Sequence, residues 1–150
     1  MKTKECLEHS LSSVIEHTAF MFADPLDKKE VIETDQEWYS AEISFSGPAN
    51  GHIVLAAPSA LCDDMAVNML GLESRPEGPE KPDALCEILN MTCGRFLTEK
   101  YGAEPIFNLT PPKVSKIDDK RREELLKRDE SLAMQIDDKP LITLVEIKGQ

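Results

Sequence analysis

The chain has 150 residues, 41% of them hydrophobic and 30% charged, which predicts one well-packed domain and excludes a disordered or fibrous chain. The formal net charge of −11 argues against nucleic acid and anionic membranes as partners, because both require clustered Lys and Arg. No apolar run is long enough to span a membrane and the first residues lack a signal-peptide pattern, so we expect a cytoplasmic protein.

The first half of the chain predicts a long helix, a candidate short strand, a β-hairpin and a second helix. These elements fall at residues 4–23, 28–34, 39–46 with 52–57, and 58–71. Apolar residues recur at helical spacing in the first helix, whereas they alternate with polar residues in the strand at 39–46. Asp24-Pro25 ends the first helix, residues 47–51 are expected to form the hairpin loop, and Gly71 stops the second helix.

The second half predicts a loop, a third helix, a strand, a charged segment and a terminal hairpin. These elements fall at residues 73–82, 82–100, 106–109, 118–129, and 132–136 with 141–147. Gly102 stops the third helix and Pro111-Pro112 breaks the following strand. The charged segment is compatible with either an exposed helix or a mobile loop, so that choice stays open.

The third helix carries polar residues on a face where packing would not place them. At about 100° per residue, its apolar stripe consists of Leu85, Ile88, Leu89, Thr92 and Phe96. Asp83, Glu87, Asn90 and Gly94 gather within roughly 60° of one another on the opposite side. Asn and Gly cost up to about 1 kcal/mol each relative to Ala inside a helix, so this face loses helix stability. We therefore expect an exposed platform that a partner's backbone can approach closely.

This pattern, Asp/Ser-x-x-x-Glu-x-x-Asn followed by Gly, resembles the active-site helix of the CheC/CheX/FliY family of chemotaxis phosphatases. The order of the expected elements resembles that family over essentially the whole chain. The resemblance implies an α+β fold in a single CheX-like domain over residues 1–150. In that fold, two long related helices pack on an antiparallel sheet.

The first helix matches the motif only in part. Ser12, Glu16 and Ala19 take the positions of the motif's Asp, Glu and Asn, so the amide is missing. Some family members carry the motif on both helices, and the one-site pattern here is most like CheX. A remaining role for Ser12 and Glu16 stays open. On this alignment Ala19→Asn is the change expected to create a second, weaker site.

The family removes phosphate from the aspartyl phosphate of a CheY-like receiver domain, which makes this chain a candidate hydrolase. The resemblance implies that Asn90 orients the attacking water, that Glu87 pairs with a receiver lysine, and that Asp83 and Gly94 contact the partner. No metal or cofactor of its own is expected, with Mg²⁺ held by the receiver. CheX relatives dimerise through sheet contacts, so we also expect a homodimer. Its edge strands are expected near residues 39–46 or 141–147.

Other readings remain open beside this one. A non-catalytic module could bind a receiver or a flagellar-switch partner through the same helix, and a purely structural subunit is a third possibility. Which receiver is the substrate also stays open. Ser13 and His17 lie at helical spacing but lack a committed acid, so a hydrolytic triad is not favoured. We expect reduced, packed thiols at all four cysteines, Cys6, Cys62, Cys86 and Cys93.

Overall fold

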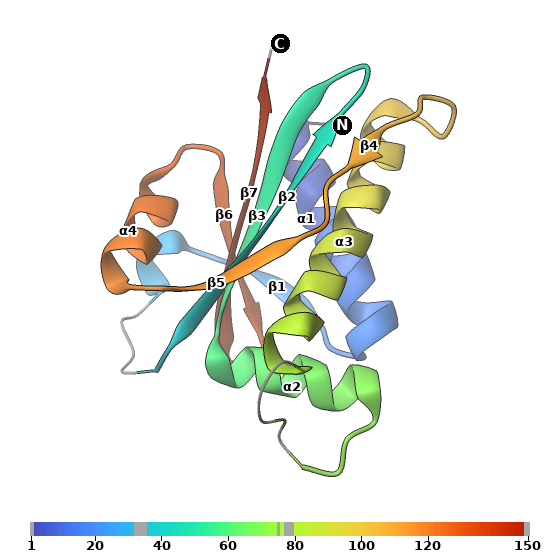
Figure 1. Ribbon diagram of the computed structural model, residues 1–150. Helices are drawn as coiled ribbons and strands as arrows, with labels where there is room; N and C mark the ends of the chain where they lie inside the picture. The colour runs from blue at the N-terminus through green and yellow to red at the C-terminus, as the bar shows by residue number, and fades with distance from the viewer. Residues whose placement is uncertain (1, 32–35, 75, 77–79, 149–150) are drawn as a thin grey trace.

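The computed structural model describes residues 2–31, 36–74, 76 and 80–148, and these form an antiparallel sheet with helices on both faces (Figure 1). The helices are α1 (Thr3–Val14), α2 (Ser59–Leu70), α3 (Glu80–Tyr101) and α4 (Asp119–Lys127), with a π-helical turn at Ile15–Ala19 and a 3-10 turn at Lys28–Glu30. The strands are β1 (Ala23–Leu26), β2 (Trp38–Ser46), β3 (Asn50–Pro58), β4 (Asn108–Leu109), β5 (Lys113–Ile117), β6 (Ser131–Ile136) and β7 (Lys139–Lys148). The α+β class and the antiparallel sheet expected from the sequence are confirmed.

The strand order is β1-β6-β7-β3-β2-β4, and β5 also pairs with β2. Both expected hairpins form: β2 pairs with β3, and β6 pairs with β7. The hairpin strands at residues 39–46 and 141–147 are therefore internal, because β4 and β5 cover the free side of β2 and β6 covers that of β7. The expectation that either strand offers a free edge for dimer contacts is wrong. Among the described strands, β1 lies at one edge and β4 and β5 at the other.

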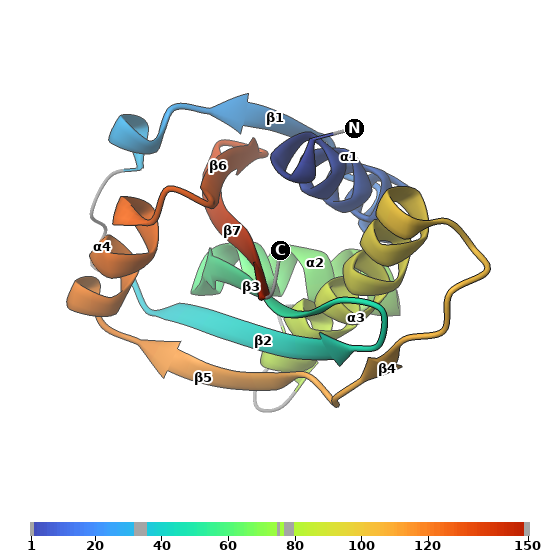
Figure 2. The same ribbon diagram turned by 90° about the horizontal axis from the view of Figure 1, so that it is seen from above.

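The main core lies between the sheet and the pair α1 and α3, which run side by side on one face (Figure 2). Alternate residues of β2, such as Ala41, Ile43 and Phe45, point toward this core. Each large apolar side chain buried there contributes roughly 1.5–3 kcal/mol relative to exposure. On the other face α4 covers a smaller cluster, in which the Arg122 guanidinium lies 5.3 Å from the centre of the Trp38 ring. The sheet therefore forms a rigid floor under α3.

The first helix ends earlier than its apolar pattern predicts. The π-helical turn stops at Ala19, and Phe20 follows in the left-handed conformation at φ 58°. Residues 23–26 then form β1, although Pro25 lacks an amide donor, because an edge strand tolerates proline. The strand expected at 28–34 is not present at 28–30, which form a 3-10 turn, and its residues 32–34 lie outside the described part of the chain.

The second half of the chain differs from the prediction at one strand and settles whether the charged segment is a helix or a loop. The strand expected at 106–109 shrinks to β4, and β5 follows it without having been predicted. The charged segment forms α4, whose N-terminus is capped by the Asp118 carboxylate accepting a hydrogen bond from the Arg121 amide at 2.8 Å. Asp137 and Asp138 both adopt positive φ values, 47° and 68°, in the turn between β6 and β7. Asp118 therefore caps α4, and the two positive φ values suit the two-residue turn of a β-hairpin.

Candidate active site

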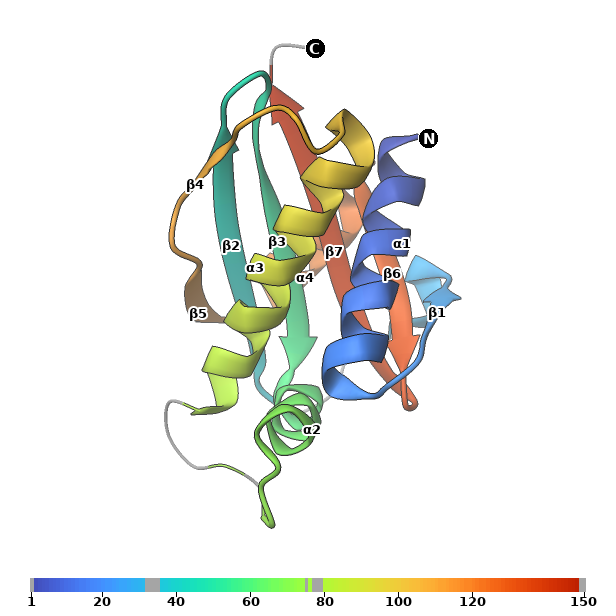
Figure 3. The ribbon, with the colours of Figure 1, turned by 90° about the vertical axis from the view of Figure 1, so that its right-hand side faces the viewer.

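The outer side of α3 faces away from the sheet (Figure 3). The side chains of Asp83, Glu87 and Asn90 are exposed, and Gly94 is half-buried one turn further on. The opposite stripe is fully packed into the main core; it consists of Leu85, Ile88, Leu89, Thr92 and Phe96. The predicted exposure of the motif face is confirmed. Because its apolar stripe is held by the sheet, the helix presents the carboxylates and the carboxamide in a fixed arrangement.

Packing does not require glycine at position 94. A Cβ atom placed on Gly94 meets nothing within 4 Å, whereas a Cβ on Gly51 would lie 2.2 Å from the carbonyl oxygen of Glu146. Gly51 is thus needed by the β3–β7 pairing, while Gly94 leaves open space on the surface one turn after Asn90. This space suits close approach by another backbone.

A polar cluster joins α1 to α3 on the same helical layer. The Glu99 carboxylate accepts hydrogen bonds from Ser10 at 2.8 Å, from His9 at 3.0 Å and from Arg95 at 2.9 Å. Burial by itself raises the pKa of Glu99, but these hydrogen bonds together lower it below the ordinary value. No local pattern predicts this cluster, because its donors on α1 lie about 90 positions away in the chain.

The counterpart of the motif on the first helix does not form a second site. Glu16 is exposed, but Ala19 is completely buried, whereas Asn90 is exposed on α3. The π-helical turn Ile15–Ala19 shifts the helical register, and the Asn68 side chain donates a 2.7 Å hydrogen bond to the Ala19 carbonyl. The expectation that Ala19→Asn creates a second site is therefore wrong, since its amide would enter the core.

The geometry also excludes a serine–histidine nucleophile on α1. His17 Nδ1 lies 2.8 Å from the Ser13 carbonyl oxygen and 3.4 Å from the Ser13 hydroxyl. A carbonyl only accepts hydrogen bonds, so Nδ1 carries the proton and cannot take one from the hydroxyl. Ser13 is therefore not activated by His17.

The thiols nearest the motif are suited to packing. All four cysteines are free, as expected. Burial raises the pKa of the Cys93 thiol to about 12, and burial followed by the Asp83 charge raises the pKa of Cys86. Neither thiol is activated as a nucleophile, because reactivity requires the thiolate.

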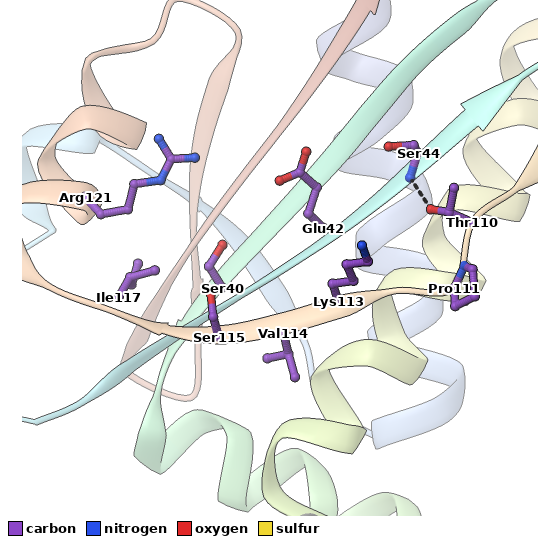
Figure 4. A pocket seen from close by; sticks show the side chains of 10 residues that line it. All are labelled: Ser40, Glu42, Ser44, Thr110, Pro111, Lys113, Val114, Ser115, Ile117 and Arg121. Carbon is purple, nitrogen blue, oxygen red and sulfur yellow. Dashed lines mark hydrogen bonds between the residues drawn. The ribbon is translucent and has the colours of Figure 1, made fainter.

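A cavity of about 730 Å³ lies on the face of the sheet opposite the motif (Figure 4). Its lining includes Ser40, Glu42 and Ser44, which alternate along β2 with the residues that face the main core. Its rim is tied by a 3.0 Å hydrogen bond from the Ser44 amide to the Thr110 hydroxyl. The hollow is thus separated from Asn90 by the sheet itself.

The described ranges contain neither a candidate metal site nor a helix that could cross a membrane. Residues 2–31, 36–74, 76 and 80–148 contain no group of three or more His, Cys, Asp or Glu side chains placed to hold a metal ion. In the same part of the chain, no helix combines the length and apolar character needed to cross a membrane. The motif face of α3 remains the candidate site.

A comparison with models of known protein families shows the family to which this chain belongs. The family model for the chemotaxis phosphatase CheX matches residues 39–136, which include the whole motif. The chain belongs to the CheX family. No curated protein matches it significantly in sequence. The family that the motif resembles is therefore confirmed, although α1 lies outside the matched range.

Solved structures of CheX and CheC-like proteins share the fold. CheX from Desulfovibrio desulfuricans aligns with a TM-score of 0.73 and 14% identity, covering 99% of this chain and 100% of the other. A CheC-like superfamily protein from Shewanella aligns with a TM-score of 0.68 and 22% identity, covering 99% and 100%. The CheX–CheY–BeF₃–Mg²⁺ complex from Borrelia burgdorferi aligns with a TM-score of 0.68 and 17% identity, covering 97% of each chain. At these identities the likeness establishes the fold.

Proposed function

We propose that this chain is a phosphatase for the aspartyl phosphate of a CheY-like receiver domain and that the motif face of α3 is its working surface. The observation that carries the proposal is the exposure of Glu87 and Asn90 on one side of a helix whose other side is locked into the core. Membership of a chemotaxis phosphatase family supports it. The similar fold of a CheX protein solved together with CheY supports a receiver as the partner.

Asn90 is proposed to position the attacking water. Its amide oxygen accepts a hydrogen bond from that water, and its amide nitrogen donates one to a phosphoryl oxygen. The water oxygen then bonds to phosphorus in line with the leaving group as the bond from phosphorus to the aspartyl oxygen breaks. The receiver carboxylate leaves with that electron pair, and the water's proton passes to the inorganic phosphate or to solvent. A divalent cation held by the receiver neutralises charge on the phosphoryl oxygens.

The acyl phosphate is already activated, so positioning supplies most of the remaining acceleration. A carboxylate at position 90 would repel the phosphoryl group, which favours the neutral amide there. Glu87 is proposed to pair with a receiver lysine instead, and Asp83 and Gly94 to seat the docked surface. The proposed phosphatase needs no cofactor of its own. A homodimer and a cytoplasmic location stay predictions.

The decisive experiment follows phosphate release from phosphorylated receivers with wild-type chain, Asn90→Ala and Thr98→Ala. Thr98 is exposed on the same helix beyond the motif and serves as the matched control. We expect Asn90→Ala to abolish acceleration while stability stays equal or rises by up to about 0.7 kcal/mol, because Ala is the better helix former. Thr98→Ala should act as wild type. If Asn90→Ala keeps an accelerated wild-type rate, Asn90 does not position the attacking water. If the wild-type chain and Asn90→Ala both bind the receiver and neither accelerates phosphate release, the surface is a non-catalytic docking module.

A further inference from the structure

Phe20 combines two features that a purely structural residue would avoid. Its backbone adopts the left-handed conformation, φ 58° and ψ 37°, in which glycine or asparagine is far better tolerated than a bulky residue. Its side chain is also 73% exposed. A helix end explains the left-handed backbone but does not explain an aromatic ring there. Backbone outliers of this kind cluster at functional sites.

The surrounding structure holds Phe20 in place. Its neighbours Ala19 and Met21 are 0% and 3% exposed, so the ring projects from a segment anchored on both sides. The Phe20 amide donates to the Ile15 carbonyl and closes the π-helical turn. Asn68 from α2 holds the Ala19 carbonyl. The ring is therefore presented outward from a fixed position.

The antiparallel pairing of α1 and α3 sets Phe20 level with the motif along the helix pair (Figure 3). Cys6 meets the Phe96 carbonyl at 3.8 Å, and Ser10 meets Glu99 at 2.8 Å. Counting onward along α1 and backward along α3 by equal numbers of residues sets Phe20 level with the segment of α3 between residues 82 and 89. In Figure 3 the end of α1 lies at the level of this first half of α3, where the two helices spread apart and α2 crosses below both. A standard protein–protein interface buries about 800 Å² on each partner, which is wide enough for one docked domain to cover both surfaces.

We propose that Phe20 is an aromatic anchor that inserts into the surface of the receiver docked on α3. The inference rests on the proposed function and adds α1 to its binding surface. Exposed carboxylates occur at this level on both helices: Glu16 lies in the π-helical turn that precedes Phe20, and Asp83 and Glu87 lie in the facing segment of α3. The fitting partner surface is thus an apolar depression bordered by basic side chains, next to the receiver's phosphorylated aspartate. An anchor of this kind acts on binding and leaves the chemical step unchanged.

The test measures KM and kcat of full-length variants with a receiver domain phosphorylated by acetyl phosphate. We expect Phe20→Ala and Phe20→Asn to raise KM about tenfold or more, with kcat unchanged within about threefold, and Phe20→Tyr to retain the wild-type KM. Asn suits the left-handed backbone, so Phe20→Asn should melt at the wild-type temperature or above it. The matched control is Ile106→Asn, which removes another apolar side chain, 82% exposed beyond the far end of α3, and should change nothing.

The outcomes separate this inference from the proposed function. If Asn90→Ala is inactive but Phe20→Asn keeps the wild-type KM, the anchor is wrong and the phosphatase stands. If KM rises only in variants that melt at lower temperature, Phe20 has a structural role and the anchor is also wrong. If the wild-type chain accelerates phosphate loss from no receiver, the proposed function fails, and the anchor fails with it.

Discussion

The hydroxyl of Ser10 donates a 2.8 Å hydrogen bond to the carboxylate of Glu99, 89 positions later in the chain. His9 and Arg95 donate to the same carboxylate, so the Glu99 side chain clamps α1 to α3, and we call these four residues the Glu99 clamp. This clamp lies toward the end of α3 away from the motif. It fixes how the two helices sit against each other and therefore how the motif is presented.

Glu99→Gln should lower the free energy of unfolding by about 1–3 kcal/mol at pH 7, because the charge-assisted hydrogen bonds to the carboxylate are lost. The pKa of Glu99 is lowered in the folded chain, so its stabilisation is complete above the unfolded value and disappears as pH falls through the folded value. The difference between wild type and Glu99→Gln should therefore shrink as pH falls below 4.5, the ordinary carboxyl pKa. Urea titrations from pH 7 to about pH 2 measure it.

Glu104→Gln is the matched control for this titration, because Glu104 is exposed beyond the end of α3. It should leave stability unchanged at every pH. A wild-type advantage over Glu99→Gln that stays constant across the acid range would contradict the clamp's dependence on ionised Glu99.

Glu87→Gln should weaken receiver docking while leaving the fold unchanged, because the side chain is exposed and keeps its shape. Losing the proposed charge pair should raise KM about tenfold at low salt. The difference in KM between Glu87→Gln and wild type should be smaller at high salt, because screening weakens the charge pair in the wild type. Steady-state kinetics at two ionic strengths measure both effects. Glu42→Gln, on the opposite face of the sheet, should behave as wild type. Equal salt dependence of the wild type and Glu87→Gln would count against the lysine pairing.

Gly94→Ala should stabilise the chain by about 1 kcal/mol, because the new methyl group enters open space and alanine favours the helix. Gly94→Leu should also fold, yet it should raise the receiver KM by occupying the bare surface next to Asn90. Thermal unfolding and steady-state kinetics on both variants test the two effects. An unchanged KM in Gly94→Leu would show that no partner approaches this glycine.

Ala19→Asn should destabilise the chain by about 1–3 kcal/mol, because a polar amide would replace a fully buried methyl group. It should add no second phosphatase site. Thr18→Asn, at a half-buried neighbouring position in the same turn, should cost less. Unfolding curves and the stoichiometry of receiver binding measure these outcomes. A stable Ala19→Asn chain that binds two receivers would overturn this conclusion.

The sequence predicted those elements whose pattern reflects local burial. Residues 58–71 and 82–100 were recognisable as α2 and α3 because apolar spacing and terminal glycines agree there. The two hairpins followed from alternation and turn residues. The exposed motif face followed from the same periodicity, since the stripe opposite to it is apolar.

Elements defined by distant partners were not predictable in this way. β1 contains Asp24 and Pro25 and exists because β6 pairs with it, while the polar strand β5 exists because β2 does. The π-helical turn before Phe20 changes the register of α1, so an alignment based on α-helical spacing placed Ala19 on the wrong side. The Glu99 clamp likewise depends on how the helices pack. These features come from tertiary contacts, which periodicity does not encode.

The position of β7 in the middle of the sheet affects when this fold can form during translation. Asn50 pairs with Lys148 and Ala56 with Ile142, so the sheet's central pairing joins segments separated by most of the chain. Until the ribosome has released residues 139–148, β3 lacks one neighbour and α3 packs on an incomplete floor. Closing such long loops slows folding. A nascent chain therefore carries the complete motif well before the sheet that supports the motif helix is complete.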